Sequence, residues 1–128
     1  MPRFAILEHT GAPDDPVGRH YDLLLEAGDA CRTWRLAEIP KPGGPPVTAV
    51  ELPPHRLAWL DHIAGEVSGG RGFARRVDAG EYRIVTSDAA TLMAATRCTI
   101  TVTSPFLPPQ IELERQSQDW AVCGSPRR

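Results

Sequence analysis

The sequence offers little from which a disulfide framework, a structural zinc site or a transmembrane helix could be built. Its 128 residues include three cysteines, and no two of them form a CxxC pair, which argues against both a disulfide scaffold and a cysteine-based zinc site. No apolar run approaches 18 residues, so we expect no membrane-spanning helix and no membrane partner. The N-terminal Met-Pro-Arg-Phe enters a strand pattern without the layout of a signal peptide. These absences predict a soluble protein of the reducing cytoplasm.

Lysine is almost missing as well, since Lys41 is the only one. The net charge is -2 and the isoelectric point is near 6.1, whereas a strong non-specific nucleic-acid binder would usually be basic. Arginine supplies nearly all of the positive charge, and its guanidinium favours bidentate contacts with phosphate or carboxylate. The composition therefore excludes a strongly basic surface but leaves room for a small local basic site.

A long helical period is also absent, and short strand-like stretches recur instead, at spacings of about 8–12 residues. They predict strands at residues 4–9, 20–26, 31–36, 47–52, 73–78, 81–86, 98–103, 110–115 and 120–123. We expect Pro53-Pro54 to end the fourth strand and Ala79-Gly80 to form a hairpin turn. Residues 56–62 fit either a strand or a helical turn, and residues 91–95 fit a short strand. The pattern predicts one all-β domain over residues 1–128, a barrel or a sandwich, with long glycine- and proline-rich loops.

The stretch His20–Glu26 alternates polar and apolar residues, as a half-buried strand does. This alternation predicts a core-facing side made of Tyr21, Leu23 and Leu25. The other side would carry the polar residues His20 and Asp22, with Leu24 among them, and we expect it to line a solvent-accessible cleft. Because a slip by one residue would reverse the two faces, the apolar side fixes the register.

Two residues of this polar face could bind one metal ion. His20 and Asp22 are two positions apart on a strand, so their backbones lie about 6.6 Å apart on the same side. His9, at the end of the apolar run of residues 4–7, is a candidate third ligand. Two imidazoles and a carboxylate suit Mn²⁺, Fe²⁺ or Zn²⁺ with positions left open for substrate. The same ligand pattern occurs in non-haem Fe(II) oxygenases, and unrelated surface or core histidines would give it too.

The order of these segments resembles that of a known family. An Arg-Phe strand ends in His9, a His-Tyr-Asp strand follows, and a tryptophan strand returns. Later come His55 and a Gly-Glu-x-x-x-Gly loop beginning at Gly65. Across roughly residues 3–82 this arrangement is similar to the 3′-phosphoesterase domain of bacterial DNA ligase D.

The resemblance implies a compact β-barrel that removes 3′-phosphates or terminal ribonucleotides from DNA ends with Mn²⁺, although Zn²⁺ or another transition metal also suits the ligands. It places His9, His20 and Asp22 as the metal ligands, and these three with His55, the second and phosphate-facing histidine, as the catalytic set. The implied partners are DNA 3′ ends or a primer–template, and a ligase or polymerase acting in trans.

The sequence also departs from the family pattern. Leu24 stands where the family has an arginine, Trp59 where it has a tyrosine, and the loop between His9 and His20 is longer. We expect another arginine to bind the substrate phosphate in place of the missing one, with Arg71 in the glycine-rich loop first and Arg19 or Arg76 next. The alternative is a non-catalytic relative that binds nucleic-acid ends or a protein partner.

Overall fold

The computed structural model describes residues 1–127. Within them the chain forms nine strands and two short 3-10 helices, in the order β1 (Arg3–Thr10), β2 (Arg19–Ala27), β3 (Ala30–Leu36), β4 (Val47–Arg56), η1 (Leu57–Asp61), β5 (Ala64–Glu66), β6 (Phe73–Ser87), η2 (Leu92–Ala94), β7 (Arg97–Val102), β8 (Gln110–Gln116) and β9 (Asp119–Gly124). Neither 3-10 helix of this described part is long and apolar enough to cross a membrane.

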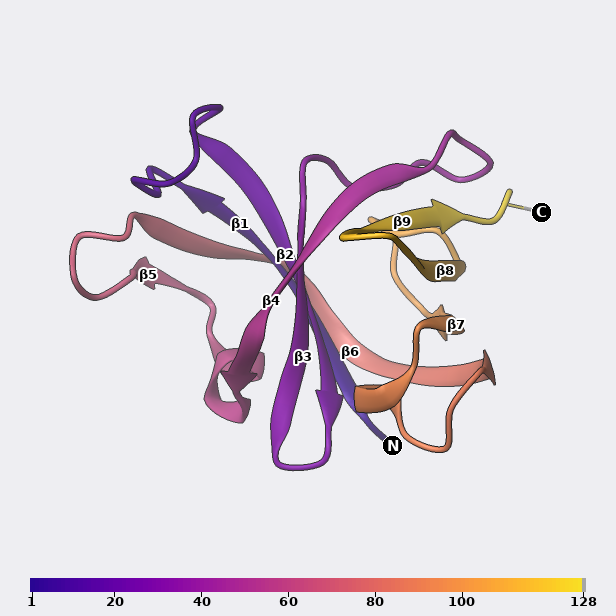
Figure 1. The fold of residues 1–128 in the computed structure, drawn as a ribbon. Coiled ribbons are helices and arrows are strands. Elements are labelled where there is room, and N and C mark those ends of the chain that lie inside the picture. Colours follow the sequence, from indigo (N-terminus) through magenta and orange to yellow (C-terminus); the bar gives the residue numbers. More distant parts are fainter. Residues whose placement is uncertain (128) are drawn as a thin grey trace.

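Eight of the strands close into an antiparallel barrel. The order around it is β1-β2-β3-β4-β9-β8-β7-β6, and β6 pairs back onto β1. The short strand β5 adds to the free edge of β6, on the side of the molecule away from β7, β8 and β9 (Figure 1). Closure satisfies the backbone groups that an open sheet would leave at its edges. The prediction of an all-β barrel is therefore confirmed, and the sandwich alternative is excluded.

The main core fills the interior of the barrel. The interior side chains come from alternate positions of the strands and include Phe4, Ile6, Leu23, Leu25, Trp34, Ile100, Leu113, Trp120 and Val122. Leu23 and Leu25 are buried as the alternation predicted, and Tyr21 packs against them at the margin. Burying each large side chain contributes about 1.5–3 kcal/mol. The barrel interior therefore supplies most of the hydrophobic contribution to the stability of the fold.

A second, smaller apolar cluster lies on the opposite face of strands β1 to β3, outside the barrel. It consists of Ala5, Leu7, Leu24, Cys31 and Leu60. Leu60 belongs to η1, which packs over these strands as part of residues 53–72, here called the cover segment. Both faces of β2 are therefore buried. Leu24 is fully buried rather than solvent-facing, which corrects the expectation drawn from simple alternation.

Two breaker pairs proved to lie inside strands. Strand β4 continues through Pro53-Pro54 as far as Arg56, because the prolines sit at the irregularity where its register with β3 shifts. Strand β6 runs without a turn through Ala79-Gly80, which pair with β1. A Cβ on Gly80 would lie 3.2 Å from the Phe4 ring, so this glycine serves a close approach and not a turn.

Two ambiguous segments are short 3-10 helices. Residues 56–62 contain η1, which agrees with the helical-turn alternative. Residues 91–95 were expected as a strand and instead contain η2. The carbonyls of Leu92 and Ala95 at η2 accept hydrogen bonds from the buried Arg32, a long-range contact that local propensity does not register.

Candidate metal centre

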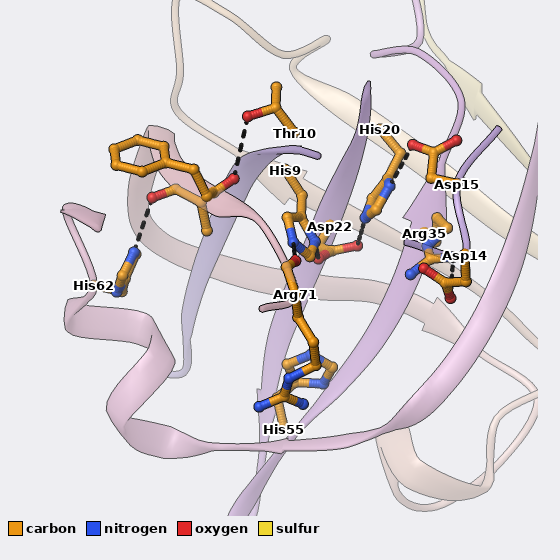
Figure 2. A network of polar contacts seen from close by, with 12 residues as sticks. His9, Thr10, Asp14, Asp15, His20, Asp22, Arg35, His55, His62 and Arg71 are labelled. Atoms are coloured by element: carbon orange, nitrogen blue, oxygen red, sulfur yellow. Dashed lines mark hydrogen bonds and ion pairs between the residues drawn. The ribbon is translucent and has the colours of Figure 1, made fainter. Parts of the chain in front are cut away.

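The candidate ligands converge where β1 ends beside the start of β2. The register pairs His9 directly with His20, so both imidazoles lie on the same face of the sheet, and Asp22 follows two residues later. The ligand atoms of all three lie within 4.8 Å of one another. His9 Nδ1 is 3.7 Å from Asp22 Oδ2, and His20 Nε2 is 3.4 Å from Asp22 Oδ1 (Figure 2).

In each imidazole, one nitrogen faces Asp22 and the other makes a hydrogen bond on the far side of the ring. That bond indicates which nitrogen of the neutral ring carries the proton. His9 Nε2 lies 2.6 Å from the Arg71 carbonyl, which can only accept, so Nε2 carries the proton and Nδ1 the lone pair. His20 Nδ1 donates to the Asp15 carboxylate at 2.9 Å, which leaves the lone pair on Nε2. When both imidazoles are neutral, each directs an acceptor atom at the Asp22 carboxylate. A cation held between these atoms would satisfy them.

The buried atoms of the cluster fit a metal ion. Within residues 1–127, His20 Nε2 and Asp22 Oδ1 are fully buried and have no hydrogen-bond partner, a state that ordinarily costs about 1–3 kcal/mol per group. Two ligands that are each 2.1 Å from one ion at a tetrahedral angle lie about 3.4 Å apart. The 3.4 Å between His20 Nε2 and Asp22 Oδ1 matches this spacing, and His9 Nδ1 lies slightly farther from Asp22 Oδ2, at 3.7 Å. The two-imidazole, one-carboxylate donor set suits Mn²⁺, Fe²⁺ or Zn²⁺ without selecting among them.

Without an ion, the carboxylates beside His20 favour its protonated form. Burial is the largest influence on the pKa of His20 and lowers it, but the nearby carboxylates of Asp22 and Asp15 outweigh burial, so the pKa is raised above its ordinary 6.5. His20 is only 2% exposed. The prediction that it lines an open cleft is therefore wrong, because the loop between β1 and β2 covers it. Asp22 does reach the cleft.

Asp15, in this same loop, was missed by the sequence analysis. Its carboxylate accepts hydrogen bonds from His20 and from the backbone N–H of Val17. The bond from His20 is the main cause that lowers the pKa of Asp15, so the carboxylate stays ionised. A carboxylate behind a ligating imidazole fixes the ring orientation and increases its basicity. The only local signal was an acidic pair in a breaker-rich loop, which by itself indicates a turn.

A cleft of about 610 Å³ opens beside the cluster, between strands β1 to β3 and the cover segment. His9 and Asp22 lie on one wall, and His55 and Trp59 belong to the cover segment opposite. The Nδ1–H of His55 donates to the Pro53 carbonyl at 3.0 Å, which leaves Nε2 available. The cleft therefore brings His55 to the same space as the metal ligands, although it is more than thirty residues away in sequence.

The three arginines proposed from the sequence occupy different places. Arg71 lines the cleft, but its guanidinium is engaged by the carbonyl and hydroxyl of Ser68. Arg19 is outside the cleft lining and lies over the ring of Tyr21. Arg76, also outside it, donates to the Leu60 carbonyl. Of these arginines, only Arg71 lines the cleft, and its backbone carbonyl, not its guanidinium, contacts His9.

Gly72 keeps that carbonyl in position. Its φ of +94° favours glycine, and a Cβ there would overlap the backbone carbonyl of Thr10. The Gly72 carbonyl also accepts the N–H of Val67 at 2.7 Å, which closes the glycine-rich loop. The tight packing of this loop on the end of β1 therefore places the Arg71 carbonyl against His9.

Arg35 is an arginine of the cleft that the sequence analysis did not consider. It lies on β3 directly opposite Asp22 on β2, and it lines the cleft. Its guanidinium contacts Asp14 at 3.2 Å, while its buried Nε has no hydrogen-bond partner among the described residues. Figure 2 shows this pair beside the His20–Asp22 contact.

Comparison with known proteins adds no assignment. No protein-family model matches the chain, and no curated protein matches it significantly. The function must therefore be inferred from the geometry of the site itself.

Proposed function

We propose that this protein is a metal-dependent phosphoesterase of the Mn²⁺ type that acts on DNA 3′ ends, removing a 3′-phosphate or a 3′-ribonucleotide. The observation that carries this proposal is the convergence of His9, His20 and Asp22 at the edge of a cleft, with two of their buried atoms left without partners. The resemblance of residues 3–82 to the ligase D phosphoesterase domain gives the substrate class.

The cleft supplies the other groups that phosphoryl transfer needs. A divalent ion held by the three ligands would polarise a phosphoryl oxygen and favour ionisation of a water molecule. His55 faces the same space with a free Nε2, so it can hold a proton for the leaving oxygen or donate to a phosphate oxygen. Trp59 offers an aromatic face against which a base or sugar can pack.

The form of the cleft agrees with a chain end as substrate. A volume of about 610 Å³ is within the range of small-ligand sites, about 300–1,000 Å³, and can take one terminal nucleotide. The remainder of a primer–template would lie outside. A ligase or polymerase acting in trans would then seal or extend the healed end.

A non-catalytic binding module is the second candidate. It is favoured by two features at the positions where the resembling family has an arginine and a tyrosine. Leu24 is fully buried and cannot contact substrate, and Trp59 brings no hydroxyl. If these losses are not compensated, the cleft would retain DNA ends without cleaving them.

The test is turnover of a 3′-phosphorylated primer–template with Mn²⁺, Mg²⁺ or Zn²⁺. We expect weak phosphate release by the wild-type protein with Mn²⁺, none by His20→Ala, and wild-type release by Arg83→Gln. Arg83 is exposed on β6 and outside the cleft lining, so it is a suitable control. A wild-type protein that binds Mn²⁺ and the DNA but releases no phosphate with any metal would favour the binding module.

A further inference from the structure

Asp14 and Arg35 form an ion pair at the mouth of the cleft. Asp14 belongs to the loop between β1 and β2, its side chain is 70% exposed, and its Oδ2 lies 3.2 Å from Arg35 Nη1. Arg35 is less accessible, with a side chain 25% exposed. An ion pair with one such exposed partner contributes little to stability, because water and salt screen it. The contact is therefore easily exchanged for another anion.

The position of Arg35 places its charge beside the candidate metal ligands. Arg35 and Asp22 are direct cross-strand partners, so their side chains leave the sheet on the same face with Cβ atoms about 4.5–5.5 Å apart. The buried Nε of Arg35 has no partner within residues 1–127. The Nε–H is thus unpaired, and a bidentate oxyanion that displaced Asp14 and reached this edge would pair with it and with an Nη–H.

We propose that Arg35 is the anion-binding and specificity-determining residue of the cleft, that it binds a phosphoryl group, and that Asp14 occupies its guanidinium until the phosphate displaces it. This assignment rests on the proposed function for the identity of the substrate. In the resembling family the phosphate-binding arginine lies at the position of Leu24, which is on β2 here and is buried beneath η1. Arg35 would supply the positive charge from the neighbouring strand β3 instead. A tetrahedral dianion would outcompete the Asp14 carboxylate because it carries more charge and would also contact an ion held by His9, His20 and Asp22.

Binding of inorganic phosphate to the full chain, measured by isothermal titration calorimetry in chelator-treated protein and again with Zn²⁺, tests the role of Arg35. We expect Arg35→Gln to weaken phosphate binding about ten- to a hundredfold, as loss of a charge-assisted pair does. Arg35→Lys should recover part of the affinity, because it restores the charge but not the planar fork. Arg83→Gln is the matched control and should bind like the wild type.

Asp14→Asn tests whether Asp14 competes with phosphate for Arg35 or only stabilises the loop between β1 and β2. If Asp14 occupies the phosphate position, its neutralisation should tighten phosphate binding several-fold while thermal unfolding stays unchanged. Equal or weaker phosphate binding by Asp14→Asn would overturn the proposal, as would unchanged binding by Arg35→Gln. Acetate, titrated in parallel, should bind more weakly than phosphate, and a preference for acetate would also overturn it.

Turnover distinguishes failure of this inference from failure of the proposed function. Arg35-dependent phosphate binding without release of phosphate from 3′-phosphorylated DNA would leave the anion site in place and reject the enzyme. Release of phosphate by Arg35→Gln with an unchanged KM would keep the enzyme and reject Arg35 as its specificity residue.

Discussion

Arg32 and His20 are both almost fully buried, at 5% and 2% exposure, yet their surroundings differ in one decisive respect. Arg32 lies inside the barrel between the rings of Trp34 and Trp120, at 5.0 and 4.8 Å. Its guanidinium donates to both carboxylate oxygens of Glu51 and to two backbone carbonyls of the η2 region. This buried charge has partners on every side, and it joins β3 to β4 and η2.

The His20 cluster lies outside the barrel, on strands β1 and β2, and is incomplete. The imidazole has a donor bond to Asp15, but its second nitrogen and the facing oxygen of Asp22 lack hydrogen-bond partners among the described residues. A buried polar group without a partner is costly, whereas one with all its partners is not. The comparison indicates that Arg32 stabilises the fold, while His20 is arranged for a ligand.

The largest expected effect is the loss of the Arg32 network. Arg32→Met should destabilise the protein by about 3 kcal/mol, because breaking a buried ion pair leaves its partners unsatisfied. Urea unfolding with and without Mn²⁺ measures it, and the loss should be the same in both conditions. The control is Arg97→Met, whose exposed pair with Glu114 at 3.6 Å should matter by less than about 1 kcal/mol. Equal losses of unfolding free energy in Arg32→Met and Arg97→Met would show that the buried network is worth no more than an exposed ion pair.

Metal addition should stabilise the protein through the His20 cluster and not through the Arg32 network. Mn²⁺ or Zn²⁺ at a hundred times its Kd should raise the unfolding free energy of the wild type by about 2.7 kcal/mol. His20→Ala should show no such gain, because it removes the imidazole that Asp15 holds against Asp22 and leaves only two ligands. Thermal unfolding against metal concentration is the measurement. A metal-dependent gain in His20→Ala equal to that of the wild type would place the ion elsewhere.

Asp15 should matter less than the ligands themselves. Asp15→Asn removes the charge behind His20 but leaves the three ligands in place, and such changes typically weaken metal binding about 10–100-fold. Asp14→Asn, one residue earlier in the same loop, should leave metal affinity unchanged. Competition against a chelating dye resolves both values. If the two variants bind metal alike, Asp15 does not orient His20.

The smallest effect is the pH dependence. Because the pKa of His20 is raised above 6.5 in the folded protein, protonated His20 stabilises the metal-free fold fully below pH 6.5, and this contribution is lost as pH rises through the raised pKa. Metal requires the neutral ring, so apparent metal affinity should increase with pH, about tenfold per unit below that pKa. A pH-independent Kd between pH 6 and 8 would contradict proton competition at His20.

The sequence predicted best what depends on near neighbours. Alternation located most strands and placed His20 and Asp22 on one face, since residues two apart on a strand share it. The approach of His9 depended on the register of β1 with β2, which a resemblance suggested and spacing alone does not define. Asp15 and Arg35 were not foreseen, because a loop conformation and a lateral strand neighbour arise only in the folded chain. The burial of Leu24 was misjudged for the same reason, as residues 53–72 cover it.

The way the cover segment is attached has a consequence for motion. The barrel strands are joined by continuous ladders, whereas β5 meets β6 at only three residue pairs and η1 contributes a single buried side chain, Leu60. Side-chain contacts such as Arg3 with Asp61 and Arg76 with Leu60 add to this attachment, but none forms a continuous backbone ladder. Such a segment opens locally at lower cost than global unfolding. We therefore expect backbone amides of residues 57–72 to exchange with solvent well before those of the barrel. Slower exchange there upon ligand binding would show that the wall carrying His55 closes on its ligand while the barrel stays unchanged.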